Sequence, residues 1–225
     1  MKTGVKNVLL VLALALPMKA AGEEVVIEPP ANGSVSREDG LAAWERIYEV
    51  TSHPRCANCH VGPDNLPMWS GPSYGTARPH GMNIDAGESR VGAEYVPCQT
   101  CHAFSETGGN MGAHAAPQVA DAWHLAPVEM QWFGKSSVEI CQQLRDPERN
   151  GGQDYIELAE HLGHGPLVSW GWDPGGGREP APHSLQAHID DMLAWGAAGF
   201  PWTRSGRRAR SPTWPCRSRT SRTSS

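Results

Sequence analysis

Apolar residues first recur at helical spacing shortly after position 35. The residues on this face are Leu41, Trp44, Ile47 and Tyr48. Ser36 can cap the helix, with Asp39 three positions later, and the pattern stops at His53-Pro54. The sequence therefore predicts a helix from Ser36 to the proline. Before it, positions 23–35 contain Pro29-Pro30 and predict a disordered lead.

Three further helices are predicted in the second half of the chain. Ser136 and Glu139 have the spacing of a capping box, which predicts a helix running to Leu144. The other two are predicted at 154–162 and 184–194. Positions 61–97 show little periodicity and many Gly and Pro, which predicts loop. The expected fold is mainly α with extensive loops, in a single compact domain at 36–199.

The amino terminus has the pattern of an export signal. Lys2 and Lys6 precede an apolar run from Val8 to Leu16, and small residues follow up to Gly22. We expect a signal peptide at 1–22 that is cleaved near Gly22, which predicts a periplasmic protein; the alternative is an uncleaved signal that anchors it. No later segment approaches the roughly 20 apolar residues of a membrane helix, so no stable membrane insertion is expected after cleavage.

Charge divides the chain into an acidic body and a basic tail. Positions 23–200 carry 24 acidic and nine basic residues, whereas positions 201–225 carry seven Arg and no acidic residue. An acidic body repels nucleic acid and attracts basic redox partners, although it also serves simple solubility. We interpret 200–225 as a basic low-complexity tail, with a docking arm, a disordered extension and a frameshifted terminus as the open readings.

Four of the six cysteines belong to two copies of a Cys-x-x-Cys-His motif. The copies are Cys56-Ala-Asn-Cys59-His60 and Cys98-Gln-Thr-Cys101-His102. Two thiols at this spacing can bond both vinyl groups of one porphyrin, and the adjacent histidine then ligates the iron from the proximal side. The motifs predict two covalently bound haem c groups. A zinc cage, a disulfide and a redox dithiol are the alternatives.

The two predicted haems share one domain. Cys56 and Cys98 are only 42 positions apart, too few for a separate globular domain around each haem. We therefore expect the haems to lie close together and to exchange electrons. The composition is poor in Leu, Ile, Val and Phe, so the porphyrins are expected to complete a weak core.

The sixth iron ligand decides whether such a protein carries electrons or catalyses a reaction. We predict His80 for the first haem and His124 for the second, and a crossed arrangement with His80 on the second iron is also open. The rivals are Met68 and Met82 for the first haem and Met111, His114 and Met130 for the second. The leading hypothesis is an electron-transfer protein without catalytic residues of its own. A peroxidase-like enzyme or a haem-based sensor with one open iron is the alternative.

The remaining cysteines and several longer stretches support narrower expectations. Cys141 is either a free buried thiol or a partner for Cys216. The second haem motif, together with 79–83, 123–127, Met130 and 168–175, resembles the di-haem periplasmic cytochromes labelled as isoquinoline 1-oxidoreductase subunits. That resemblance, over about 40–199, implies a molybdenum hydroxylase type of dehydrogenase as electron donor and the respiratory chain as acceptor. The Arg-rich tail departs from it.

Overall fold

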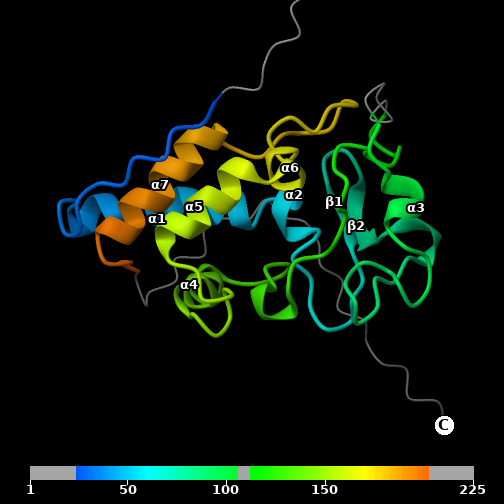
Figure 1. The fold of residues 1–225 in the computed structure, drawn as a ribbon, viewed down its shortest axis with the longest axis horizontal. Coiled ribbons are helices and arrows are strands. Elements are labelled where there is room, and N and C mark those ends of the chain that lie inside the picture. The colour runs from blue at the N-terminus through cyan, green and yellow to red at the C-terminus, as the bar shows by residue number, and fades with distance from the viewer. Residues whose placement is uncertain (1–23, 106–111, 203–225) are drawn as a thin grey trace, which may run out of the picture.

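The computed structural model describes residues 24–105 and 112–202. The predicted signal peptide, the alternative ligand Met111, Cys216 and positions 203–225 of the tail lie outside these residues. The described chain is a mainly helical compact domain with long loops and one small hairpin. Figure 1 shows the longer helices on one side of the molecule, with the hairpin and α3 on the other.

The longer helices begin where their caps predict. The first, α1 (Arg37–Thr51), is capped by Ser36, whose side chain accepts a hydrogen bond from Asp39 N at 3.0 Å. The capping box of Ser136 and Glu139 is formed and starts α4 (Ser137–Arg145). The two remaining longer helices are α5 (Tyr155–His164) and α7 (Leu185–Ala197), which runs three residues beyond its predicted end. These helices confirm the local capping arguments.

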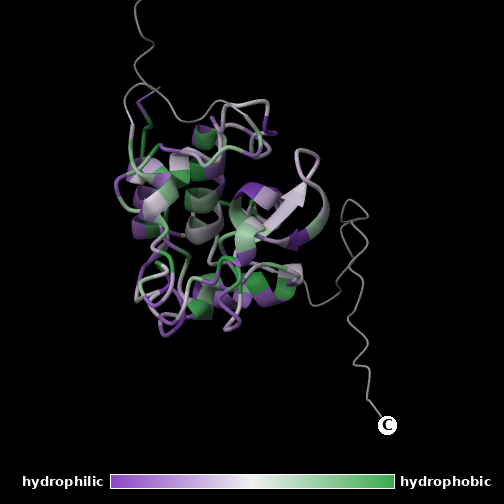
Figure 2. Cartoon of the chain, turned by 90° about the vertical axis from the view of Figure 1, so that its right-hand side faces the viewer, coloured by the Kyte–Doolittle hydropathy of each residue, from purple (hydrophilic) through white to green (hydrophobic). Residues whose placement is uncertain are grey.

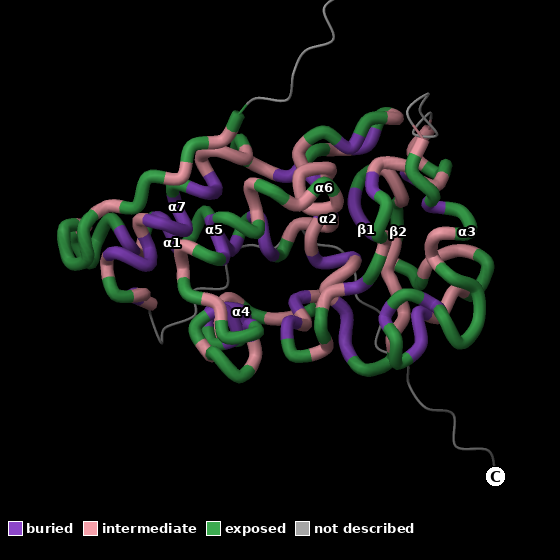
Figure 3. The backbone as a smooth tube through the Cα atoms, viewed as in Figure 1, coloured by how far each residue is buried: buried purple, intermediate pink, exposed green. Residues whose placement is uncertain are grey.

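The main core lies between α1, α5 and α7, which pack side by side (Figure 1). Trp44 and Trp195 are almost fully buried, with ring centroids 4.8 Å apart. Burying a large apolar side chain contributes roughly 1.5–3 kcal/mol. Figure 3 shows buried and exposed positions alternating along α1, whereas α7 is mostly buried, and Figure 2 shows hydrophobic residues interspersed with hydrophilic ones in the described part of the chain. At the edge of this core, Arg46 and Asp191 form an ion pair that joins the two helices.

The segment 24–35 is packed, contrary to the predicted disordered lead. Val25 and Ile27 pack against the main core, and the amide of Val26 donates to the side chain of Gln186 at 2.8 Å. Gln186 returns a hydrogen bond to the carbonyl of Val26, also at 2.8 Å. The physical reason is that the main core covers two apolar side chains of this segment and that Gln186 of α7 pairs with its backbone, which the sequence of the lead alone does not reveal.

The predicted loop at 61–97 contains an antiparallel hairpin. Its strands are β1 (Met68–Gly71) and β2 (Gly75–Pro79), paired with Met68 opposite Pro79 and Trp69 opposite Arg78. A register irregularity after Trp69 and a positive φ of 103° at Gly71 interrupt the ladder. Such short strands carry too few residues for an alternating pattern to appear, so the sequence did not predict them.

Five short helical segments complete the domain and include both cysteine motifs. They are α2 (Pro54–Ala57), the 3₁₀ turn η1 (Gly81–Asn83), α3 (Gln99–His102), the 3₁₀ turn η2 (Val128–Met130) and α6 (Pro166–Ser169). The first motif therefore begins on α2, shortly after α1. The second motif begins at Cys98, the N-cap of α3, and its other residues form that helix. Within the described residues, no helix has the length and apolar character that crossing a bilayer requires.

Candidate haem-binding site

The histidine of the first motif is held in one orientation by residues far along the chain. The ring of His60 stacks on that of Trp132, with centroids 3.5 Å apart and planes at 4°. Its Nδ1 lies 2.8 Å from the carbonyl oxygen of Met130. Trp132 N and Phe133 N both donate to the carbonyl of His60, at 2.8 and 2.9 Å. The segment 130–133 therefore clamps both the backbone and the ring of this histidine.

The second motif repeats this construction with different residues. The ring of His102 stacks on that of Trp123, with centroids 4.2 Å apart and planes at 11°. Its Nδ1 lies 3.0 Å from the carbonyl oxygen of Pro117. The histidine of each motif thus stacks on a tryptophan and is hydrogen-bonded through Nδ1 to a backbone carbonyl. Neither the tryptophans nor the carbonyls were identified as functional from the sequence, because nothing in their spacing from the motifs signals the contact.

The two hydrogen bonds from Nδ1 to a carbonyl oxygen determine which ring nitrogen of each histidine carries the proton. A carbonyl oxygen only accepts, so Nδ1 carries the proton and donates it. Burial lowers the pKa of His60 to about 3 and that of His102 to about 4, so both rings are neutral at pH 7. Nε2 of each ring consequently keeps its lone pair. This is the tautomer that a metal-ligating histidine adopts when its other nitrogen is held by a carbonyl.

A cavity of about 310 Å³ lies between the two motifs. Its lining includes Cys59 of the first motif and Cys98, Cys101 and His102 of the second. Most of the remaining wall is apolar or aromatic, as expected for a site that takes a flat organic cofactor. Cys56 and His60 lie outside the lining and pack toward the main core instead. The cavity therefore belongs chiefly to the second motif, and the first borders it through Cys59.

Arg90 fixes the loop that joins the motifs. Its buried guanidinium donates to the carbonyls of Val61 and Gly62, both at 3.0 Å, and also to the carbonyl of Ala126. The amide of Ala126 in turn donates to the carbonyl of Cys59 at 3.3 Å. Several backbone acceptors around one guanidinium replace the regular secondary structure that this loop lacks. The thiol of Cys59 is thereby positioned against the small second core of Val61, Ala86 and Leu125.

The structure brings His80 to the second motif, in the crossed arrangement. The ring centroid of His80 lies 6.2 Å from that of His102, with the planes at 62°. Its Nδ1 lies 2.9 Å from the carbonyl oxygen of Gly81, which leaves its Nε2 free as well. Ligation by His80 stays a prediction, but its neighbour is the second motif rather than the first.

The other candidate ligands separate into two groups. His124, His114, Met68 and Met82 line the same cavity, and Met82 is 76% exposed. Met130 is buried in the main core, and its carbonyl faces Nδ1 of His60. Met130 thus lies with the first motif, although it was considered for the second.

The alternatives to haem find little support in the geometry. The five described cysteines are all free, and burial raises the pKa of Cys56 to about 12 and that of Cys59 to about 11. Among the described residues, no group of three or more His, Cys, Asp or Glu is arranged to hold a metal ion. A four-ligand zinc cage is therefore not formed there. Cys141 is buried and free, and its proposed partner Cys216 is not described.

The chain was compared with protein-family models, with curated proteins and with solved structures, and none matches it.

Proposed function

We propose that this chain is a di-haem c-type cytochrome that transfers electrons. One haem c would be bonded to Cys56 and Cys59, the other to Cys98 and Cys101, with His60 and His102 as proximal ligands. The observation that carries the proposal is the matched state of the two histidines. Each is neutral, stacked on a tryptophan and fixed through Nδ1, so each keeps on Nε2 the lone pair that an iron ligand needs.

Bound haem supplies one-electron exchange between ferric and ferrous iron. The protein residues would bind and orient it: the four motif cysteines would hold the ring covalently, and His60 and His102 would ligate the iron. The ring of His80 lies 6.2 Å from that of His102 and lines the same cavity, which favours a filled sixth position on the second iron. Because Cys59 lines the same cavity as the thiols of the second motif, the two haems would lie close enough for rapid exchange.

The proposed partners and compartment follow from charge, signal and resemblance. An acidic body favours encounter with redox proteins that carry basic patches. The resemblance described above suggests a molybdenum hydroxylase type of dehydrogenase as donor and the respiratory chain as acceptor. The signal pattern at 1–22 places the mature protein in the periplasm in this proposal, with no nucleic-acid partner and no membrane insertion.

Haem stoichiometry in cysteine variants tests the proposal. The full chain, expressed with export and haem-attachment machinery, should contain two c-type haems per polypeptide by the pyridine haemochrome assay. The C56A/C59A and C98A/C101A variants should each retain one. C141A is the matched control, because this buried cysteine lies outside both motifs, and it should retain two.

Two results would contradict the proposal. A full chain that is exported and folded but carries no covalent haem excludes it outright. Equal haem content in the wild-type chain and in both double variants excludes the assignment of the thiols.

A further inference from the structure

Arg55 forms part of the cavity wall although it belongs to the first motif's helix. It immediately precedes Cys56 on α2 and lines the cavity that His102 and His80 border. Its side chain is only 2% exposed. The guanidinium carbon lies 5.4 Å from the ring centre of Tyr74 and 5.3 Å from that of Trp170. The guanidinium is thus held by aromatic rings from two distant segments.

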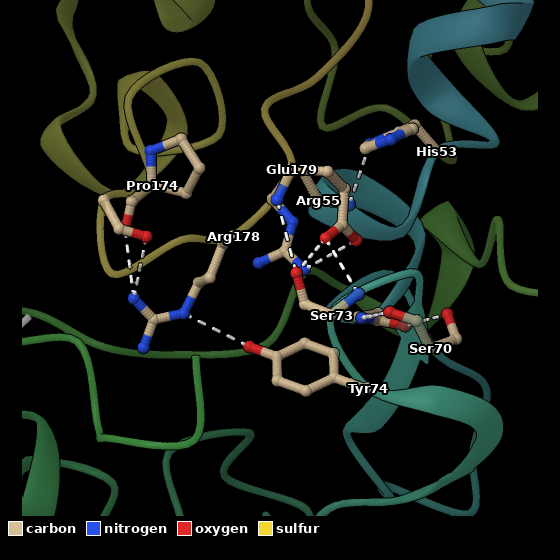
Figure 4. A network of polar contacts seen from close by, with 10 residues as sticks. His53, Arg55, Ser70, Ser73, Tyr74, Pro174, Arg178 and Glu179 are labelled. Atoms are coloured by element: carbon tan, nitrogen blue, oxygen red, sulfur yellow. Dashed lines mark hydrogen bonds and ion pairs between the residues drawn. The ribbon is translucent and has the colours of Figure 1, made fainter. Parts of the chain in front are cut away.

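The hydrogen bonds of this guanidinium are incomplete. Nη2 donates to Oε1 of Glu179 at 3.3 Å, which is long for a charged pair. Glu179 is shared, because its Oε2 accepts from Ser73 N at 3.1 Å and from the Ser73 hydroxyl (Figure 4). Nε of Arg55 is buried without an acceptor among the described residues. A buried charged donor without an acceptor is unfavourable, so a ligand that supplies an acceptor would be favoured.

We infer that Arg55 binds a carboxylate of the molecule that occupies the cavity. The inference rests on the proposed function, in which that molecule is the haem of the second motif and the carboxylate is one of its propionates. A carboxylate accepts the Nε–H and Nη–H donors of a guanidinium side by side, which fits the donor left free here. An arginine of the first motif would then hold the haem of the second, and the two motifs would form one binding unit.

The variants R55K and R55Q test this assignment, with R37Q as the matched control on the exposed start of α1. Lysine keeps the charge but has no Nε–H, and glutamine loses both. We expect the propionate bending band in the resonance Raman spectrum of one haem to shift in R55K and R55Q and to stay in place in R37Q. In R55Q, removal of a cation should also favour the ferric form at least tenfold, about 59 mV in midpoint potential.

The outcomes separate this inference from the proposed function. Two haems with unmoved propionate bands in both Arg55 variants would overturn the inference and leave the cytochrome assignment standing. No haem in the wild-type chain would remove both. If neither Arg55 variant binds haem, the E179Q variant tests the inference instead. Replacing Glu179 releases Nη2 of Arg55 from its ion pair, so the propionate bending band should shift in the direction of a stronger hydrogen bond. An unmoved band overturns the inference.

Discussion

If the chain is the di-haem cytochrome proposed above, removing His80 should open one iron, and only one. Two imidazoles on opposite sides of one metal, with bonds of about 2.0–2.1 Å and ring radii of about 1.2 Å, have centroids about 6.4 Å apart. The centroids of His80 and His102 are 6.2 Å apart, which is close to this separation. The angle of 62° between the rings is compatible with axial ligation, because each plane need only contain the iron–nitrogen bond.

The assay is carbon monoxide binding to the reduced protein, in single-haem backgrounds. In C56A/C59A, which keeps the second haem, H80A should take up one equivalent of carbon monoxide, whereas the background alone should take up none. In C98A/C101A, which keeps the first haem, H80A should change nothing. H164A is the control, since His164 is exposed at the end of α5.

Two observations would refute this reasoning. H80A in the C56A/C59A background could remain unreactive toward carbon monoxide, which would show that another residue fills the sixth position. Alternatively, H80A could open the first haem, in the C98A/C101A background. That result would restore the uncrossed arrangement and contradict the proximity on which the prediction depends.

Three further predictions concern stability, each measured by denaturant unfolding monitored by circular dichroism. Burial lowers the pKa of His188 from an ordinary 6.5 to about 3, so this side chain binds a proton at a higher pH in the unfolded chain than in the folded one. Its contribution to the free energy of unfolding should drop between pH 6.5 and 3 by up to about 5 kcal/mol. H188L should remove that share of the total loss, to which His60 and His102 also contribute. G196A should cost about 1–3 kcal/mol, because a Cβ there would meet the ring of Tyr155, whereas G112A, with nothing within 4 Å, should be near neutral. S136A should cost about 1 kcal/mol by removing the cap of α4. An unchanged unfolding midpoint in G196A or S136A, or an unchanged pH dependence in H188L, would contradict the cause given for that prediction.

The parts of the fold that the sequence predicted are those decided locally. Ser36 and Ser136 act on amides three residues away, so a short window of sequence contains both partners. The hairpin and the packed segment 24–35 depend on distant partners. Ser73 bonds Glu179, and Val26 bonds Gln186, more than 100 positions along the chain. No window of ordinary length contains both residues of either pair.

The same distinction holds at the candidate site. The cysteines and the adjacent histidines are recognisable because a haem-attachment motif has a fixed spacing. The features that orient the histidines are not, since a backbone carbonyl has no sequence signature and Trp132 resembles any core tryptophan. The role proposed for Arg55 could not be predicted from the sequence either, because it depends on an Nε donor without an acceptor rather than on a sequence pattern.

The two carbonyl–histidine hydrogen bonds differ in the length of chain that they close, and this sets an order of assembly. His102 donates to the carbonyl of Pro117, 15 positions away, whereas His60 donates to that of Met130, 70 positions away. Loop-closure entropy makes the longer closure about 1.4 kcal/mol more costly. As the chain folds, the second histidine should therefore acquire its orientation before the first, so the second motif would be ordered first.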